Sequence, residues 1–308
     1  MMDLIQLRTF AVAAEEQHLT RAAERLHISQ SAASAHVRAL EESFGIRLFV
    51  RTPRGLELTD AGSHLLGEAK DLLHRAAAVA AHARQLGGQL GGALQVGCNS
   101  DPVLSRVAGI VQALREHAPG IHLALYARTS MATREGVRNG ELDAGLLIGR
   151  PSDDRDAGLD YLVLRSLRYR IAGPAAWRER IEAADWPALA ALPWITPIGN
   201  ALAYARMLDA LFTERGLQRN TVVETDNDLL QRTLVAGGAG LSLMREDHAL
   251  AGVAAGTMAL SPIGEAASNL LLAYPAARRG DPLLSALVAA VRMVWPQAQG
   301  PAKTSPAD

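Results

Sequence analysis

The sequence predicts an α+β protein of more than one domain: a small helical domain with a hairpin, one long helix, and a larger α/β domain of two lobes. Three observations carry this prediction. Residues 3–42 have the pattern of three short helices, residues 59–86 have one continuous helical pattern, and strand patterns alternate with helix patterns from residue 93 onward. A length of 308 residues is sufficient for two or three domains.

The composition excludes several classes of protein. Hydrophobic residues make up 49% of the chain and charged residues 20%, which is typical of soluble globular proteins and excludes a disordered or fibrous chain. The 31 basic and 32 acidic residues nearly cancel, so any surface for nucleic acid must be local. A single cysteine excludes a disulfide-stapled secreted scaffold, and the nine histidines lack the spacing of a metal site. We expect neither a metal nor a cofactor.

Features of targeting and membrane insertion are missing from the sequence. The amino terminus carries Asp3 and Arg8 inside an amphipathic pattern, without the apolar core and cleavage site of a signal peptide. The longest uncharged stretch, residues 186–205, contains three prolines and is interpreted as loop, buried strand and helix start. We therefore expect a cytoplasmic, nucleoid-associated protein without a membrane partner.

Residues 1–58 are predicted to form the first domain. Its three helices break near His18 and His27, and Thr20 and Ser29 are expected to cap the second and third helices. Apolar residues at 44–50 and 56–58 flank a turn with proline and glycine, which predicts a short hairpin. Three helices followed by a hairpin is the order of a winged helix-turn-helix.

The first turn of the third helix carries short polar side chains that suit the major groove of DNA. Arginines in the hairpin turn are expected on the sugar-phosphate backbone or in the minor groove. The predicted DNA-binding residues are Arg21, Ser29, Gln30, Ser31, Ser34, His36, Arg38, Arg51 and Arg54. The alternative is an ordinary three-helix domain with solvated polar faces.

Residues 59–87 are predicted as a linker helix that begins at Thr59 as N-cap and carries a heptad seam. Large apolar residues recur every seven positions, and small residues follow four positions after each of the first four. The large set is Leu58, Leu65, Leu72, Val79 and Leu86, and the small set is Gly62, Ala69, Ala76 and Ala83. We expect this seam to form a dimer; packing within the chain's own domain is the alternative.

The remaining residues are predicted as a glycine-rich hinge at 88–92, an α/β domain at 93–296 and a flexible tail at 297–308. Strands are expected near residues 93–98, 123–127, 143–148, 193–196, 222–225, 240–244 and 269–274. Helices are expected near residues 102–117, 131–139, 202–215, 228–236 and 282–294. This alternation predicts a parallel or mixed sheet in two small lobes. Since no GxSxG motif or carboxylate pair is present, we do not expect an enzyme.

A small-molecule site is expected at the carboxyl ends of the strands and at helix amino termini. The predicted ligand-binding residues are Cys98, Asn99, Ser100, Arg128, Thr129, Ser130, Gly149, Pro197, Gly199, Asn200, Asp226 and Asn227. Arg128, Arg150 and Arg206 favour an anionic ligand. The alternative is that these residues only cap strands and turns. Cys98 is either an oxidant sensor or, more commonly for a lone cysteine, a small buried hydrophobe.

Several segments resemble a LysR-type transcriptional regulator. The dense part of the resemblance comprises Leu4–Glu16, Thr20–Ser31, Ala39–Glu41, Leu48–Phe49, Arg51–Thr52 and Leu58–Gly62, and a looser part comprises Gly140–Asp143 and Leu234–Leu241. The resemblance implies a winged helix-turn-helix, a dimerisation helix and a two-lobed effector domain of the periplasmic-binding-protein type. The chain departs from the family pattern at Ser31, usually proline, at Ala35–His36, usually Arg-Gln, and at Arg128, commonly glycine.

The resemblance also implies a function. It is that of a sequence-specific regulator that binds double-stranded operator DNA as a homodimer or homotetramer, with a small-molecule effector between the two lobes modulating its DNA contacts. RNA polymerase would be a further partner of an activator. Two alternatives remain: an architectural DNA-binding protein whose α/β domain only mediates oligomerisation, and an enzyme or solute-binding module with an accessory helical domain.

Overall fold

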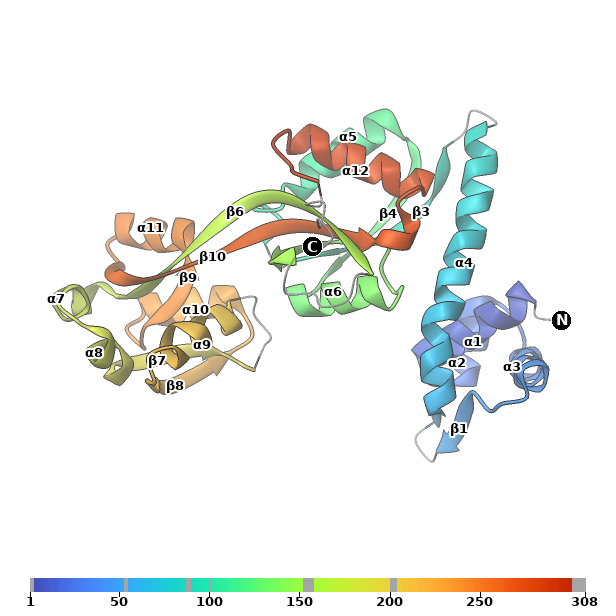
Figure 1. Ribbon diagram of the computed structural model, residues 1–308, viewed down its shortest axis with the longest axis horizontal. Helices are drawn as coiled ribbons and strands as arrows, with labels where there is room; N and C mark the ends of the chain where they lie inside the picture. Colours follow the sequence, from blue (N-terminus) through green and yellow to red (C-terminus); the bar gives the residue numbers. More distant parts are fainter. Residues whose placement is uncertain are drawn as a thin grey trace, which may run out of the picture. The chain divides into compact units, whose positions relative to one another are not determined.

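The computed structural model describes residues 3–52, 55–86, 90–99, 101–151, 158–199 and 204–300. The chain divides into two compact units, Met1–Gly92 with Asp281–Leu283, and Ala93–Gly280 with Leu284–Asp308. Figure 1 shows a helical unit with a hairpin and a two-lobed α/β unit. No helix in the described ranges is both long and apolar enough to cross a bilayer.

The first unit consists of three short helices, a hairpin and one long helix. Its elements are α1 (Leu4–Glu16), α2 (Leu19–Leu26), α3 (Gln30–Phe44), β1 (Phe49–Thr52), β2 (Gly55–Leu58) and α4 (Asp60–Leu86). Phe10 of α1 is fully buried, and its ring meets that of Phe49 edge-on at a centroid distance of 5.5 Å. Leu40 and Leu48 are also fully buried in this core, so the hairpin is fixed to the helices by apolar packing.

Local chemistry sets the helix boundaries in this unit. Ser29 caps α3 as predicted, because its Oγ accepts a hydrogen bond from the Ala32 amide at 3.1 Å. The prediction that Thr20 caps α2 is wrong, since His18 is the N-cap and its Nδ1 accepts from the Thr20 amide at 3.2 Å. The hairpin's first strand is also shorter than predicted, because α3 continues to Phe44 and β1 begins only at Phe49.

Helix α4 uses part of the predicted heptad seam inside its own domain. Thr59 caps the helix as predicted, its Oγ1 accepting from the Gly62 amide at 2.9 Å. A Cβ added to Gly62 would lie 2.2 Å from the Leu48 carbonyl oxygen, so this small position lets the helix approach the hairpin. Leu58 belongs to β2 rather than to the helix, and both it and Leu65 pack against the core of the first unit.

The later part of the seam faces solvent. Leu72 is 37% exposed and Val79 is 71% exposed. The side chain of Leu86 lies outside the described residues. Dimerisation through Leu72 and Val79 therefore stays a prediction, whereas the earlier positions follow the alternative of internal packing.

The second unit has two lobes joined by two long antiparallel strands, β6 (Leu159–Pro174) and β10 (Met258–Pro275), which run from one lobe into the other (Figure 1). The first lobe contains β3 (Gly91–Cys98), β4 (Gly120–Ala127), β5 (Ala144–Gly149), α5 (Val107–His117), α6 (Ser130–Arg138) and α12 (Pro282–Val294). The second lobe contains β7 (Pro193–Pro197), β8 (Asn220–Thr225), β9 (Ser242–Arg245), α7 (Arg178–Glu182), α8 (Trp186–Ala191), α9 (Ala205–Thr213), α10 (Asp228–Ala236) and α11 (Glu246–Ala254). Short 3-10 turns at Ala175–Trp177 and Ala276–Arg278 follow the two long strands.

The sheet of this unit is mixed, as the alternating pattern predicted. Its order is β4-β3-β5-β10-β6-β9, with β3 parallel to β5 and β10 antiparallel to both β5 and β6. Helices α5 and α12 lie on one side of the first lobe's sheet and α6 lies on the other (Figure 1). Strands β7 and β8 form a second, parallel sheet in the second lobe.

The structure corrects several predicted elements of this unit. Strand β6 was not predicted at all, because Arg165, Arg168 and Arg170 interrupt its apolar alternation, and β10 is much longer than predicted. Helices α7 and α11 were missed too. Residues 186–191 were interpreted as loop but form α8, whose start is capped by Asp185 through the Ala188 amide at 2.9 Å. Helix α5 begins at Val107 rather than near residue 102.

Two predicted flexible segments are partly ordered. Residues 91–92, assigned to the hinge, already belong to β3, while residues 88–89 lie outside the described residues. The tail was predicted to begin at 297, yet Gln299 pairs with Val163 through two backbone hydrogen bonds of 2.9 Å and Ala298 is buried. This pairing with β6 holds the chain to residue 300; residues 301–308 lie outside the described part.

Candidate functional site

The leading turn of α3 presents polar side chains to solvent. Gln30 and Ser31 are exposed, Ser34 is half-buried on the same side, and Arg38 is exposed further along the helix. The Ser29 cap leaves the hydroxyls of Ser29 and Ser31 hydrogen-bonded to each other at 2.9 Å. A helix start with free amide, hydroxyl and guanidinium groups can donate to and accept from base edges and phosphates.

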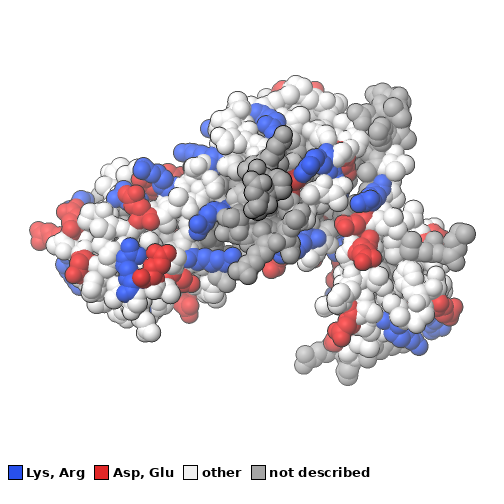
Figure 2. Space-filling view, in the orientation of Figure 1, with Lys and Arg blue, Asp and Glu red and all other residues white. Residues whose placement is uncertain are grey.

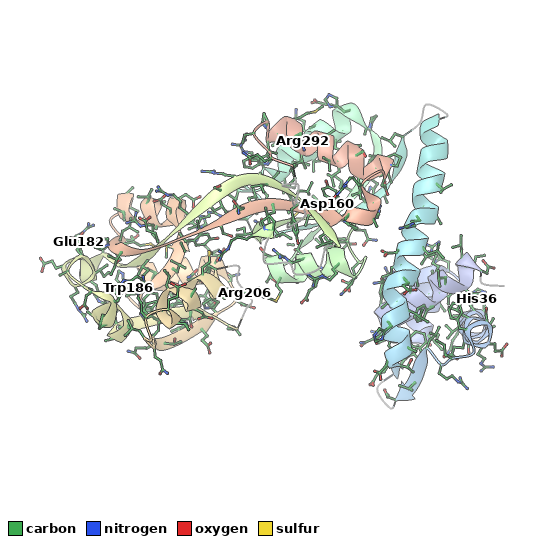
Figure 3. All side chains as sticks on the ribbon, in the orientation of Figure 1. His36, Asp160, Glu182, Trp186, Arg206 and Arg292 are labelled. Atoms are coloured by element: carbon green, nitrogen blue, oxygen red, sulfur yellow. The ribbon has the colours of Figure 1, made fainter. Side chains whose placement is uncertain are left out.

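Two of the predicted DNA contacts also hold the helices together. The Nδ1 of His36 lies 3.0 Å from the Oγ1 of Thr9, whose own hydroxyl donates to the Ile5 carbonyl at 2.9 Å. His36 of α3, which Figure 3 labels, therefore donates to the buried Thr9 of α1 and joins the two helices. The guanidinium of Arg21 donates to the Glu16 carbonyl at 2.5 Å, although the side chain is mostly exposed.

The β1–β2 hairpin, which is the wing of this domain, is attached to α3 by a buried carboxylate that the sequence analysis did not single out. Glu41 is 7% exposed, and its Oε1 accepts from the backbone amides of Leu48 at 2.8 Å and Phe49 at 3.2 Å. Its Oε2 pairs with Arg47 at 3.2 Å. By accepting from the first amides of the hairpin, this side chain fixes where the hairpin starts relative to α3. An acidic residue on the apolar face of α3 was the available signal.

The basic residues of the first unit divide into engaged and exposed groups. Lys70 is buried and pairs with Glu15 at 3.1 Å, and Arg25 pairs with both Glu15 and Glu16 at 2.8 and 3.0 Å. These pairs join α1, α2 and α4, so those two cations serve the fold. Figure 2 shows basic side chains, with acidic ones beside them, on the lower part of this unit. The side chain of Arg51 and all of Arg54 lie outside the described residues.

In the first lobe, the predicted ligand residues make contacts within the lobe. The thiol of Cys98 is buried, and burial raises its pKa, which fits a small hydrophobe rather than a reactive thiol. Asn99 is buried and accepts from the Ser105 hydroxyl at 2.7 Å. Thr129 caps α6, and the Oγ of Ser130 accepts from the Ile148 amide at 2.9 Å.

Arg128 is not a free cation in this lobe. Its guanidinium pairs with Glu141 at 3.0 Å and lies 5.6 Å from the centre of the Tyr126 ring. Gly149 is buried at the end of β5, paired with Asn269 of β10. The expectation that Arg128 attracts an anion is thus weakened by the neighbouring carboxylate.

In the second lobe, the predicted residues lie at strand ends and turns. Pro197 is buried at the end of β7, and Gly199 follows in an exposed turn with a φ of +48°. Asp226 is exposed, and Asn227 caps α10 by accepting from two backbone amides at 2.9 Å each. Arg206 is exposed at the start of α9 (Figure 3). Ser100 and Asn200 lie outside the described residues.

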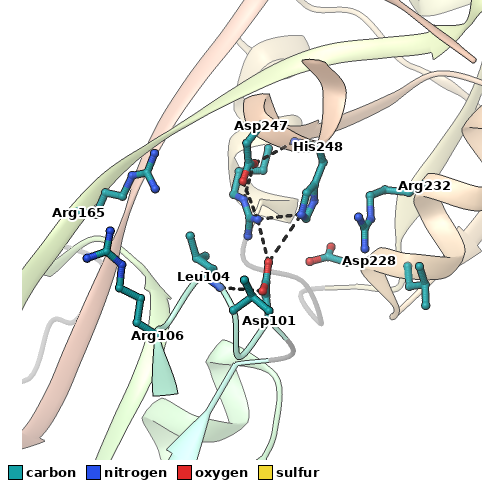
Figure 4. A pocket seen from close by; sticks show the side chains of 11 residues that line it. Asp101, Leu104, Arg106, Arg165, Asp228, Arg232, Asp247 and His248 are labelled. Atoms are coloured by element: carbon teal, nitrogen blue, oxygen red, sulfur yellow. Dashed lines mark hydrogen bonds and ion pairs between the residues drawn. The ribbon is translucent and has the colours of Figure 1, made fainter. Parts of the chain in front are cut away.

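A pocket of about 480 Å³ opens between the two lobes. One wall comes from the loop 101–106 and from Arg165 of β6, and the other from α10 and from the junction of β9 with α11 (Figure 4). None of the predicted ligand residues that the structure describes lines it. The pocket begins one residue beyond two of the predicted segments, at Asp101 and Asp228, and the junction at Arg245 was missed, although it too is the carboxyl end of a strand.

Arg245 forms a hydrogen-bonded bridge between the lobes in this pocket (Figure 4). Its Nη2 donates to the Asp101 carboxylate at 2.8 Å, its Nε and Nη2 donate to Asp247 at 2.6 and 2.8 Å, and Nη2 lies 2.7 Å from the Nε2 of His248. The second oxygen of Asp101 accepts from the Leu104 amide at 2.9 Å. Asp101 belongs to the first lobe and Arg245 to the second, so this contact holds the lobes together.

The charges in this network are mutually stabilised. Burial alone would lower the pKa of Arg245, but its hydrogen bonds to Asp247 and Asp101 raise the pKa overall. Burial alone would raise the pKa of Asp101, but the Leu104 amide and then Arg245 lower it. Burial and then Arg245 lower the pKa of His248, which favours the neutral imidazole at pH 7.

Asp228 differs from the other two carboxylates of the pocket. Its burial raises its pKa, and the opposing effects of Arg245 and Arg232 do not offset that burial. Within the described ranges, no group of three or more histidine, cysteine or acidic side chains is arranged to hold a metal ion. Aspartate and arginine side chains line the pocket, so it offers charged groups to a polar ligand.

Two family models match the chain. The model for the LysR substrate binding domain matches residues 87–296, and that for the bacterial regulatory helix-turn-helix protein of the lysR family matches residues 4–63. The chain belongs to the LysR family. It is a DNA-binding transcriptional regulator with an effector-binding domain, as its sequence resemblance implied, and the family is one of regulators rather than enzymes.

Individual relatives agree with this assignment. The chain is 30% identical to the HTH-type transcriptional regulator TtuA of Agrobacterium vitis over 79% of this chain and 80% of that protein. It is 32% identical to the regulator IlvR of Caulobacter vibrioides over 79% of this chain and 82% of that protein. A full-length OxyR variant of Pseudomonas aeruginosa has the same fold, with a TM-score of 0.67 and 23% identity over 99% of both chains.

The looser segments of the LysR resemblance have structural roles here. Asp143, in the segment Gly140–Asp143, is buried, pairs with Arg278 and accepts from the Gln95 amide at 2.6 Å. A Cβ on Gly240, in the segment Leu234–Leu241, would lie 2.7 Å from the Pro193 carbonyl oxygen. These LysR segments shape the two lobes and do not enter the interlobe pocket.

Proposed function

We propose that this LysR-family regulator binds operator DNA through α3 and the wing as a homo-oligomer, and that a small-molecule effector occupies the interlobe pocket. The observation that carries the proposal is the pocket itself, because its walls belong to different lobes and Arg245 joins them through Asp101. A ligand there contacts both lobes, so its binding energy depends on their relative orientation.

The mechanism is a shift of population between two lobe arrangements. An effector that binds one arrangement better favours it by the difference in the two binding free energies. Through the oligomer, the change alters the spacing of the two winged helices and hence the bend of the contacted DNA. DNA affinity itself need not fall.

Several finer features belong to the same proposal. The dimer forms through the exposed part of α4, where Leu72 and Val79 face solvent. The effector carries an anionic group, which the arginines of the pocket attract. The protein acts in the cytoplasm on nucleoid DNA, and RNA polymerase is a further partner at an activated promoter.

The proposal that α3 binds operator DNA is tested by a double variant in which Gln30 and Ser34 are both replaced by alanine. We expect sequence-specific binding to be lost in a fluorescence anisotropy titration, while weak salt-dependent binding and the oligomeric state are kept. The matched control is Gln112→Ala, an exposed glutamine on α5. Equal specific affinity of both variants would contradict the assignment of α3 as the recognition helix.

A further inference from the structure

The pocket contains an acidic and a basic side chain on one turn of α10 whose hydrogen-bonding groups are not saturated by the protein. From this pair, Asp228 and Arg232, we propose that the effector is a zwitterion of the α-amino-acid type, with a cationic nitrogen next to its carboxylate. The inference rests on the proposed effector site between the lobes. It names the chemical class of ligand which that site takes.

The acidic member of the pair is Asp228. It lines the pocket from the first turn of α10, whose cap is already supplied by Asn227. None of the hydrogen bonds and ion pairs among the described residues involves this carboxylate, whereas Asp101 and Asp247 are both bonded to Arg245. A partly buried carboxylate without donors is costly, and an ammonium group supplies the donors and the opposite charge.

The basic side is Arg232, one helical turn further along. Residues four apart lie on the same face of a helix, so Asp228 and Arg232 project toward the same end of the pocket, as Figure 4 shows. The Nε of Arg232 is buried without a hydrogen-bond partner in the described part of the chain. A guanidinium binds a carboxylate through two parallel hydrogen bonds, and a carboxylate is the group that an amino acid carries beside its ammonium.

The pocket lining has a small excess of positive charge, which attracts a ligand carboxylate, while Asp228 offers the opposite charge to an ammonium group. The lining contains the four arginines 106, 165, 232 and 245 against the three aspartates 101, 228 and 247, and the lowered pKa of His248 favours its neutral form at pH 7. A dicarboxylate would bring a second negative charge beside Asp228, and a simple amine would face Arg232 without a compensating anion. An ammonium and a carboxylate attached to the same carbon satisfy both side chains.

The apolar lining leaves room for a ligand side chain. Val103, Leu104 and Leu229 are the hydrophobic residues of the pocket among those described. Its volume of about 480 Å³ is at the small end of ligand sites, which run from roughly 300 to 1,000 Å³. An amino acid with an apolar side chain fits this division into a charged end and a small apolar surface.

A purely structural role for Asp228 makes a different prediction. Acids in the first turn of a helix interact favourably with its dipole, and an Asp–Arg pair four residues apart can stabilise a helix. In that case Asp228→Asn lowers the melting temperature of the ligand-free protein. If Asp228 instead binds a ligand cation, Asp228→Asn removes an unpaired, partly buried charge from the ligand-free protein and does not lower its melting temperature. The same substitution then weakens the binding of the amino acid.

The test is a thermal-shift screen of the full-length protein with the twenty L-α-amino acids, followed by calorimetric titration of each one that shifts the melting temperature. The matched probes are the N-acetyl derivative and the amide of the same amino acid, and succinate and glutarate as dicarboxylates. We expect at least one amino acid to bind and both derivatives to bind at least tenfold more weakly. Asp228→Asn should lose at least tenfold in affinity, while Asp226→Asn, an exposed neighbouring acid outside the pocket lining, should bind normally.

Several results would overturn the inference. They include the absence of binding by every amino acid, equal binding of an amino acid and its N-acetyl derivative, and equal affinity of the Asp228→Asn and Asp226→Asn variants. If a dicarboxylate binds the wild type and Asp228→Asn alike, the zwitterion is excluded while the proposed interlobe effector site stands. If an amino acid binds with all the expected effects but leaves the DNA footprint unchanged, the inference stands and the proposed regulatory coupling fails.

Discussion

The contact between Asp101 and Arg245 should contribute measurably to the stability of the two-lobed unit. The change is Asp101→Asn, which removes one negative charge and leaves the shape of the side chain. Asparagine keeps an oxygen for the Leu104 amide, but it no longer supplies a charged acceptor to Arg245 across the lobes. The substitution therefore isolates the bridge between the lobes.

The magnitude follows from the number and burial of the bonds. The Arg245 side chain is 8% exposed and that of Asp101 is 21% exposed, so solvent screens the pair only partly. One hydrogen bond to a charged group is worth about 1.5–3 kcal/mol. Since Asp247 continues to bind Arg245, we expect a loss near the lower end, about 1.5 kcal/mol.

The assay is urea unfolding of the full-length protein between pH 3 and pH 7, with Asp226→Asn as control. The pKa of Asp101 is lowered in the folded state, so its contribution is present above the unfolded-state pKa of about 3.9 and is lost as the pH falls through the folded-state value. The difference between wild type and Asp101→Asn should therefore shrink as the pH falls from about 5 to 3. A variant that unfolds like Asp226→Asn at pH 7, or a difference that is independent of pH, would refute the reasoning.

Three further predictions concern the other parts of the molecule. Val79→Asp places a charge on the exposed stretch of α4 and should shift sedimentation toward the monomer; an unchanged oligomer would remove this stretch from the interface. Phe10→Ala empties a fully buried site and should cost about 3–5 kcal/mol in thermal unfolding of the first unit, with a loss below about 1 kcal/mol contradicting its central place in the core. Cys98 should react with iodoacetamide near pH 7.5 much more slowly than in urea, because it is buried and its pKa is raised; equal rates would restore the sensor hypothesis.

Features that depend on neighbouring residues could be predicted from the sequence. The caps at Ser29 and Thr59 are side-chain contacts to amides three residues away, and the structure confirms both. Helix α10 and helix α12 have the predicted bounds because apolar periodicity and flanking glycine or proline define them locally.

Features that depend on distant residues could not be predicted from the sequence. Arg245 meets Asp101 across 144 positions of the sequence, so nothing near either residue marks the bridge. The heptad pattern of α4 is the same whether its residues face a partner or their own domain, and Leu65 and Leu72 differ only in what the fold places beside them. Ligands of α/β sheets bind at the carboxyl ends of the strands, and this principle predicted the region of the ligand site correctly. Only the tertiary structure shows that Asp228, and not Asn227, lines the pocket.

The central claim is that a ligand between the lobes changes the DNA contacts of the winged helix. A footprint of the purified protein on the DNA upstream of its own gene tests it most directly, over a salt series and with and without the amino acids that bind. The account predicts a dyad-symmetric protected site whose hypersensitive bands move when such a ligand is added and stay fixed in Asp228→Asn. Salt-sensitive protection with no preferred sequence, unaffected by any ligand, would contradict it.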